Sequence, residues 1–288
     1  MSINSYRTSE GHFKGTKETN LYYQAWENPQ ATGTIIITPG HGEHTDSYKR
    51  VIAALKNERW TIYVWDLRGH GHSDGLRGYA EEFEDYCKDY YEFLKIVLAD
   101  PSVKKGPVVF LAHSMGCLVQ TKTLLNHPEL KPDAIVFSSP LFGIGVKVPA
   151  IKKIGAEWIR KVLPKVTMWN EVSNRDVTRD PEVIRELEQD PYRHDRICAS
   201  VYLDFLQTFP IIQAKAGDLR FKTLMQISDK DPVVSTSEAL RFFEHLGSNE
   251  KDLKIYKEAK HEIYNDIVRE QVFEDLRNFL RGVEKKNE

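Results

Sequence analysis

The sequence contains little cysteine and no long apolar run. Three of its 288 residues are cysteine, namely Cys87, Cys117 and Cys198. This odd number, without metal-ligand spacing, argues against a disulfide-stapled secreted domain or a cysteine zinc site, and it predicts free thiols in a reducing compartment. No apolar stretch reaches the roughly 20 residues that a membrane-spanning helix needs. Residues 1–7 contain no signal-peptide core. We therefore expect a soluble, cytoplasmic protein, with peripheral membrane contact left open.

Neither sign of charge is in excess. The chain has 40 lysine and arginine residues and 42 aspartate and glutamate residues, which gives a formal net charge of -2. A chain this close to neutrality has no overall field that would attract nucleic acid, so we expect no nucleic-acid partner. Hydrophobic residues make up 41% of the chain and aromatic residues 11%. This composition is typical of a globular enzyme or binding protein with one large core.

Short apolar runs alternate with helical patterns over much of the chain. Residues 33–38, for example, are almost entirely apolar, as in strands that are buried on both faces of a parallel sheet. The expected strands are 33–38, 61–65, 108–112, 134–137, 223–227 and 253–256, preceded by an edge hairpin near 12–13 and 21–26. The expected helices are 48–56, 81–99, 114–126, 237–246 and a final one with Val272, Leu276, Phe279 and Leu280. This alternation predicts an α/β fold with a mostly parallel central sheet flanked by helices.

The alternation stops after Ser138-Ser139-Pro140 and resumes near residue 214. Residues 142–213 contain no clear strand pattern, and helical spacing dominates there. The apolar residues of one helical stripe are Ile151, Ile154, Trp158, Ile159 and Val162. We interpret 142–213 as an inserted helical cap, and 1–141 together with 214–288 as the α/β core.

The strand at 108–112 runs directly into Ala112-His113-Ser114-Met115-Gly116. A serine at a tight strand-to-helix corner holds its hydroxyl out of the sheet, and the flanking residues must be small because the two backbones nearly touch. Ala112 replaces the glycine that is usual at the first flanking position. The pattern predicts that Ser114 is a nucleophile, and the alternative is a buried serine at an ordinary strand end.

Two later strands end in groups that suit a serine nucleophile. One precedes Ser228-Asp229-Lys230-Asp231-Pro232 and the other precedes Lys260-His261-Glu262. Functional groups gather at the carboxyl ends of parallel strands. We therefore predict that His261 takes the proton of Ser114 and that Asp231 orients His261. Asp231 is preferred to Asp229 because Asp-Pro-Val-Val matches the usual loop of such sites, and His261 is preferred to His194 or His245 because it follows the last strand.

Negative charge that develops on a reacting carbonyl oxygen needs backbone N–H donors. One candidate is the N–H of Met115, directly after Ser114. The other is the N–H of His41, in the glycine-containing loop that follows the strand at 33–38. The alternative for this loop is a plain glycine turn.

Together these motifs resemble the monoacylglycerol lipase and lysophospholipase branch of the serine α/β-hydrolases over nearly the whole chain. The matching stretches are Gly40-x-Gly42-Glu43-His44, Asp66-Leu67-Arg68-Gly69-His70-Gly71-His72-Ser73-Asp74-Gly75, Ala112 to Gly116, Ser138-Ser139-Pro140, Asp231-Pro232-Val233-Val234, and His261-Glu262 with Asn265. Two positions depart from the family pattern. Pro39-Gly40 stands where the family has histidine and glycine, and Cys117 replaces a glycine; we expect Cys117 to be a packing residue, with a modifiable thiol as the alternative.

The resemblance implies an α/β-hydrolase fold and a cofactor-free serine esterase that acts through an acyl-enzyme, with a cap over an acyl pocket. A small lipid ester is then the expected partner, and monoacylglycerol the favoured substrate. Lysophospholipids, short-chain esters and a non-catalytic binding protein stay open as alternatives. Trp158, Ile159 and Val162 are the cap candidates for lining the pocket. His70 and His72 are interpreted as part of a structural turn, and we expect no metal.

The predicted cap helix near 151–163 is basic on its polar side, where it carries Lys152, Lys153, Arg160 and Lys161. Basic amphipathic helices often bind anionic membrane surfaces, which would bring a lipid substrate to the pocket. The alternative is a helix packed on the core with solvated lysines.

Overall fold

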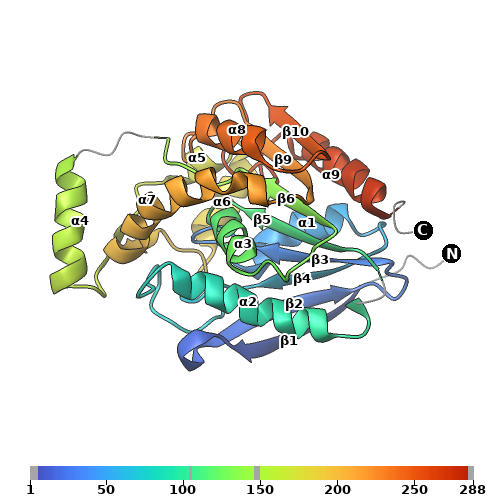
Figure 1. The fold of residues 1–288 in the computed structure, drawn as a ribbon, viewed down its shortest axis with the longest axis horizontal. Coiled ribbons are helices and arrows are strands. Elements are labelled where there is room, and N and C mark those ends of the chain that lie inside the picture. The colour runs from blue at the N-terminus through green and yellow to red at the C-terminus, as the bar shows by residue number, and fades with distance from the viewer. Residues whose placement is uncertain (1–5, 104–105, 146–149, 285–288) are drawn as a thin grey trace.

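An eight-stranded sheet runs through the centre of the molecule (Figure 1). The computed structural model describes residues 6–103, 106–145 and 150–284, with side chains from residue 155 onward in the last range. The strand order is β1-β2-β4-β3-β5-β6-β9-β10. The strands are β1 (Arg7–Lys14), β2 (Asn20–Glu27), β3 (Gly33–Thr38), β4 (Trp60–Trp65), β5 (Val108–His113), β6 (Ala134–Ser138), β9 (Lys222–Ser228) and β10 (Lys251–Tyr256). β2 pairs antiparallel with β1 and β4, and the remaining pairs are parallel, which confirms the predicted mostly parallel sheet.

Helices cover both faces of the sheet, which explains the apolar runs in its strands. In β3, Ile36 joins the core on the side of α2, α3 and α8, whereas Ile35 and Ile37 join the core on the side of α1 and α9. The covering helices are α1 (Lys49–Ala54), α2 (Glu84–Ala99), α3 (Met115–Asn126), α8 (Thr236–His245) and α9 (Arg269–Glu284). Short 3₁₀ turns span Thr16–Glu18, Thr45–Tyr48 and Ala216–Asp218. A strand buried on both faces has no polar side, so its sequence shows no alternation.

The segment between β6 and β9 is inserted into the α/β order, and its helices α4 and α7 lie at the left of Figure 1. Its elements are α4 (Ala150–Val162), β7 (Thr167–Trp169), α5 (Asn174–Val177), α6 (Pro181–Gln189), β8 (Arg196–Cys198) and α7 (Ala199–Ala214). α4 packs on α7, where Ala156 and Ile159 meet Ala199 and Leu203. β7 and β8 form an antiparallel pair, so the expectation that this segment lacks strands is wrong. Strands this short leave too little sequence for a period of two to be read.

The structure describes no helix that is both long and apolar enough to span a bilayer. The division into core and cap at residues 142 and 213 stays a prediction. Ile151, Lys152, Lys153 and Ile154, which contribute to the predicted amphipathic helix, have side chains outside the described residues.

Candidate active site

Ser114 lies at a sharp corner between β5 and α3. Its φ of 49° and ψ of -118° are unusual for a residue with a side chain, and such strain is typical of functional sites. The corner needs glycine at position 116, because a Cβ there would lie 2.3 Å from the Thr38 carbonyl oxygen and 2.4 Å from that of Pro39. Ala112, in contrast, is accommodated in the core beside α3. The tight turn predicted from the pentapeptide is therefore present, with alanine rather than glycine at position 112.

Three side chains from three strand ends form one hydrogen-bonded chain. His261 Nε2 lies 2.8 Å from Ser114 Oγ, and His261 Nδ1 lies 2.8 Å from Asp231 Oδ2. The other oxygen of Asp231 accepts hydrogen bonds from the backbone N–H groups of Val233 and Val234. Asp229 instead accepts from the Glu258 N–H in an exposed turn. The structure thus brings together the three side chains selected from the sequence and leaves Asp229 outside the chain.

The electrostatics of this chain favour a charged His261–Asp231 pair. Burial alone would lower the pKa of His261, but the charge of Asp231 and its hydrogen bond, with Glu262 and Glu43, raise that pKa above its ordinary value. Burial acts against ionisation of Asp231, yet His261 and the two backbone donors outweigh it and hold the pKa of Asp231 below its usual range. The pair is therefore arranged to hold a proton that leaves Ser114.

The loop after β3 lies against the Ser114 corner and is fixed by a buried carboxylate. Glu43 Oε2 accepts hydrogen bonds from the Gly40 N–H at 2.7 Å and from the Tyr48 hydroxyl at 2.8 Å. Because the Gly40 N–H is already used, the next N–H in the loop is that of His41. Met115 begins α3, where the first N–H groups of a helix have no acceptor within it. These are the two donors predicted from the sequence, and their role stays a prediction.

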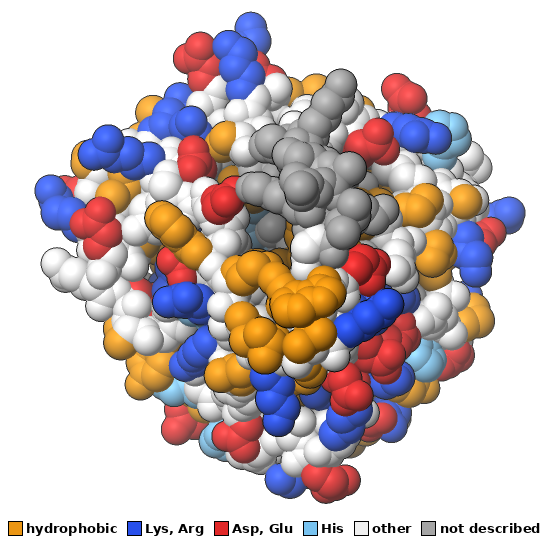
Figure 2. All heavy atoms as spheres, turned by 90° about the vertical axis from the view of Figure 1, so that its left-hand side faces the viewer, with side chains coloured by type: hydrophobic (Ala, Val, Ile, Leu, Met, Phe, Trp, Pro, Cys, Tyr) orange, Lys and Arg blue, Asp and Glu red, His pale blue; other side chains and the backbone are white. Residues whose placement is uncertain are grey.

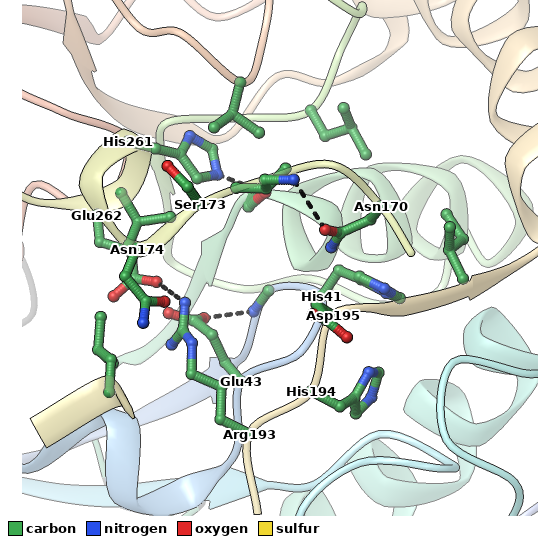
Figure 3. A pocket seen from close by; sticks show the side chains of 18 of the residues that line it. His41, Glu43, Asn170, Ser173, Asn174, Arg193, His194, Asp195, His261 and Glu262 are labelled. Atoms are coloured by element: carbon green, nitrogen blue, oxygen red, sulfur yellow. Dashed lines mark hydrogen bonds and ion pairs between the residues drawn. The ribbon is translucent and has the colours of Figure 1, made fainter. Parts of the chain in front are cut away.

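A buried charged cluster beside His261 was not predicted from the sequence. Arg193, from the segment between α6 and β8, forms an ion pair with Glu262, and Glu262 also accepts from the side-chain amide of Asn265. Figure 3 shows the Arg193 side chain close to those of Glu43 and Glu262, and all three residues line the cavity. Glu43 and Glu262 occur in the matched motifs, but no pattern around Arg193 indicates its partner.

Ser114 and His261 line a cavity of about 560 Å³, a size typical of small-molecule sites. Apolar and polar side chains share its wall (Figure 3). The apolar lining includes Leu141, Ile144, Val172, Leu187, Phe205 and Val233, and the polar lining includes Asn170, Ser173, Asn174, Glu188, Arg193 and Asp195. The expectation that Trp158, Ile159 and Val162 line the pocket needs correction. Ile159 packs against α7, whereas Trp158 and Val162 are exposed, and none of the three is among the residues that line this cavity.

The thiols are buried and unpaired with one another. Cys87, Cys117 and Cys198 are all free, as expected, and all three are buried. Cys117 Sγ donates to the Ala112 carbonyl oxygen at 3.1 Å, and burial raises the pKa of this thiol well above its usual value. Cys117 is therefore a packing residue of α3, in agreement with the preferred interpretation.

The two histidines of the Arg68-Gly69-His70-Gly71-His72 turn point to different surroundings. The ring of His72 stacks near Tyr192 at a centroid distance of 4.1 Å. The ring of His70 is fully buried and lies beside those of His41 and His194, at 5.2 and 4.4 Å. These three histidines are the group among the described residues that could hold a metal ion.

Comparison with known proteins agrees with this geometry. The family model described as serine aminopeptidase, S33 (Hydrolase_4) matches residues 29–267. The chain belongs to this family. This membership confirms the predicted α/β-hydrolase fold. It also agrees with the resemblance to monoacylglycerol lipases that the sequence motifs indicated.

Relatives of this Hydrolase_4 chain are distant but extensive. It is 27% identical to the uncharacterized protein YnbC of Escherichia coli (strain K12), over 96% of the chain and 47% of that protein, so it spans about half of that relative. It is 24% identical to a monoacylglycerol lipase of Mycolicibacterium smegmatis, over 94% of the chain and 96% of the relative. The crystal structure of Paleococcus ferrophilus monoacylglycerol lipase is similar with a TM-score of 0.82 and 23% identity, over 91% of this chain and 99% of that one.

Proposed function

We propose that this Hydrolase_4 chain is a serine ester hydrolase that cleaves single-chain lipid esters, with monoacylglycerol as the favoured substrate. The observation that carries the proposal is the chain of hydrogen bonds from Ser114 through His261 to Asp231, which opens into a cavity with both apolar and polar walls. Such a cavity suits an ester that joins an acyl chain to a polar alcohol. The names of the relatives support the same substrate class.

The geometry supports a two-step reaction. Ser114 Oγ attacks the ester carbonyl carbon while His261 Nε2 takes the hydroxyl proton, and the N–H groups of His41 and Met115 stabilise the oxyanion. The carbon–oxygen bond to the alcohol then breaks, and His261 returns the proton to the leaving oxygen. In the second step His261 takes a proton from water while the water oxygen attacks the acyl carbonyl carbon. The bond from that carbon to Ser114 Oγ then breaks, His261 returns the proton to Ser114 Oγ, and the fatty acid leaves.

Two side chains beside His261 would position the machinery rather than react. Glu43 fixes the Gly40 N–H, so the His41 N–H is left to face the substrate oxygen. Glu262 raises the pKa of His261 and is itself held by Arg193 from the segment between α6 and β8. We propose that docking of this segment on the core sets both the oxyanion loop and the basicity of His261.

An apolar surface next to the cavity supports contact with a membrane. Trp158, Val162 and Trp169 have exposed fractions of 61%, 53% and 63%. They lie with Leu163, Val166 and Met168 near the end of α4 and on β7, and Figure 2 shows such side chains gathered on this face. Trp169 also lines the cavity, so the surface continues to the pocket. We propose that this apolar surface, Trp158 to Trp169, rests on a lipid surface from which the substrate enters.

A cytoplasmic location stays part of the proposal. Three buried thiols without a disulfide suit a reducing compartment, and the proposed membrane contact is peripheral.

The test of the substrate class is a panel of monoacylglycerols, lysophospholipids and p-nitrophenyl esters, with kcat/KM measured for the wild type and for Ser114→Ala. We expect monoacylglycerols to give the highest kcat/KM and Ser114→Ala to lose roughly 10⁵-fold or more. If kcat/KM is highest for lysophospholipids or for short esters, that class is the substrate in place of monoacylglycerol. Binding of these lipids without cleavage by the wild type would favour the non-catalytic alternative and overturn the proposal.

A further inference from the structure

Three histidines from distant parts of the chain converge at one end of the cavity. His41 follows β3, His70 follows β4, and His194 precedes β8. One ring nitrogen of each lies within 4.8 Å of the other two. Figure 3 shows His41 and His194 near one another, with Asp195 beside them. The proposed hydrolysis uses the backbone of His41 but none of these three rings.

Each ring has a buried nitrogen without a hydrogen-bond partner among the described residues. These atoms are His41 Nδ1, His70 Nε2 and His194 Nε2. His70 is completely buried, so its free nitrogen has no access to bulk solvent. A buried polar atom without a partner is costly, and three ring nitrogens in one place are suited to bind a common ligand.

The opposite nitrogens are held by backbone groups. His41 Nε2 donates to the Arg196 carbonyl oxygen at 2.8 Å, and His70 Nδ1 donates to that of Arg68 at 2.9 Å. A neutral imidazole has one proton, so the free nitrogens of these two rings carry lone pairs. Histidine ligands of metals are typically oriented in this way, by a carbonyl that accepts from the second ring nitrogen.

We propose that His41, His70 and His194 form a binding site for a zinc ion. Three imidazoles with a fourth position left for water match the preferences of Zn²⁺. Zinc–nitrogen bonds of about 2.0–2.1 Å place tetrahedral ligand atoms about 3.3 Å apart. The separations between the three nitrogens, which are at most 4.8 Å, therefore shorten by no more than about 1.5 Å, which small side-chain rotations can supply.

His194 must change its tautomer when the metal binds. Its Nδ1 accepts a long hydrogen bond of 3.2 Å from the Arg196 N–H, which leaves the proton on Nε2. Binding through Nε2 moves this proton to Nδ1 and breaks that exposed hydrogen bond, with no net proton released. The Zn–N bond replaces it.

The surroundings contain charges of both signs. Arg77 and Arg193 act on the rings as positive charges, whereas Asp195 acts on His41 as a negative one. Arg193 is paired with Glu262, and Arg77 donates to the Gly71 carbonyl oxygen. His41 and His194 line the cavity, so an ion reaches the site through it.

A bound ion would tie the loop after β3 to the segment before β8. His41 belongs to the former and His194 to the latter. If the His41 N–H stabilises the oxyanion, which rests on the proposed function, the ion also steadies that donor. Zinc binding itself does not depend on Ser114.

The test is calorimetric titration of the EDTA-treated full chain with Zn²⁺, followed by the visible spectrum of the Co²⁺-substituted protein. We expect one equivalent to bind with micromolar affinity or tighter, the intense absorption of four-coordinate Co²⁺, and a higher melting temperature with Zn²⁺. His70→Gln and His194→Gln should each bind more than about tenfold more weakly. His194 is partly exposed, so its variant is expected to fold even where that of the buried His70 does not.

His245→Gln is the matched control, because this ring lies in an exposed part of α8. It should bind zinc like the wild type, and so should Ser114→Ala, which separates this proposal from the proposed hydrolysis. The zinc site is overturned if the wild type binds no equivalent of zinc, or if His194→Gln, folded as judged by circular dichroism, binds it as tightly as His245→Gln.

Discussion

Gly116 is a single position at which one methyl group should disrupt the site. A Cβ at this residue would lie 2.3 Å from the Thr38 carbonyl oxygen and 2.4 Å from that of Pro39. Both are backbone atoms, so neither can move aside as a flexible side chain would. We expect Gly116→Ala to lower the free energy of unfolding by roughly 3 kcal/mol and to reduce kcat, because Ser114 or the oxyanion loop must move. Chemical denaturation and steady-state kinetics measure the two effects.

The control for this change is Gly155→Ala in α4, where nothing lies within 4 Å of an added Cβ. This variant should gain about 0.5–1 kcal/mol from helix propensity. Equal stability of the two variants would contradict the tight corner described for Gly116.

The raised pKa of His261 predicts the pH dependence of kcat/KM. Only neutral His261 can take the proton of Ser114, so activity falls as the pH drops through the pKa of the free enzyme. Because Asp231, Glu262 and Glu43 raise this pKa against the effect of burial, the acid limb should lie above the ordinary value of about 6.5.

Glu262→Gln removes one of the charges that raise the pKa of His261 and leaves that of Arg193 uncompensated. Its acid limb should therefore move to lower pH. Glu258→Gln, an exposed carboxylate of the same region, should leave the limb in place. A limb in Glu262→Gln that coincides with that of the wild type would show that Glu262 does not tune His261.

The residues that could be predicted from the sequence are those with a local signature. Ser114 has a pentapeptide, and Asp231 and His261 directly follow strands, so the order of the chain was enough to select them. Arg193 and the trio of His41, His70 and His194 have no such signature. Their partners lie tens to more than a hundred residues away, and only the folded chain brings them together.

A buried ion pair joins two elements of the molecule. It connects the turn before α6 to the loop after β10. Arg179 donates to both oxygens of the completely buried Asp266, five residues after His261. Arg179→Ala leaves this carboxylate with its backbone donor alone, and we expect a loss of about 2 kcal/mol in the free energy of unfolding.

Arg185→Ala is the matched control, because Arg185 lies 4.0 Å from Glu182 and both side chains are largely exposed. Its effect should stay within about 0.5 kcal/mol. Urea denaturation measures the free energy of unfolding of both variants. If Arg185→Ala loses as much of it as Arg179→Ala, burial does not make the Arg179–Asp266 pair stronger than an exposed one.

The apolar surface near the end of α4 predicts binding to vesicles. Trp158→Ala combined with Val162→Ala should weaken sedimentation with both neutral and anionic vesicles roughly tenfold or more, because apolar area no longer enters the lipid. Ile96→Ala, which removes an exposed side chain from α2, is the control and should have no effect. Membrane contact through this surface is wrong if the double variant sediments like the control.

Charge contributes separately to this binding. Arg160 is paired with Asp204, but Lys161 and Lys165 are exposed beside the apolar surface. Lys161→Gln with Lys165→Gln should weaken binding to anionic vesicles by about 1 kcal/mol per lysine and leave neutral vesicles unaffected. The basic side of the predicted helix carries Lys152, Lys153, Arg160 and Lys161. If binding to anionic vesicles is unchanged when all four are replaced by glutamine, the basic residues of α4 do not contribute to it.

At the scale of elements, strands were predictable where they are buried on both faces, as in β3 and β5. β7 and β8 were missed because three-residue strands carry no period. The apolar stripe of α4 correctly indicated a helix, but periodicity does not identify the partner of an apolar face. In the structure Ile159 packs on α7 and Trp158 and Val162 are exposed, so the predicted pocket residues were wrong.

On the scale of the whole molecule, the segment between β6 and β9 supplies parts of the site. The Asp176 and Val177 carbonyl oxygens accept from the His261 and Glu262 N–H groups, and Arg193 binds Glu262. The α/β core therefore holds the reacting groups, and this segment completes their environment. The alternating rhythm of the sequence predicted the core, whereas these contacts depend on how two distant parts of the chain dock.

The proposed reaction requires Ser114 to carry the acyl group of a lipid ester during turnover. The most direct measurement is rapid acid quench of the wild type with a monoacylglycerol, followed by peptide mass spectrometry. We expect the peptide containing Ser114 to gain the mass of the acyl chain, and His261→Ala and Asp231→Asn to acylate far more slowly, the latter by roughly 10⁴-fold. An acyl group found on another residue, or rapid turnover by Ser114→Ala, would contradict the proposed reaction.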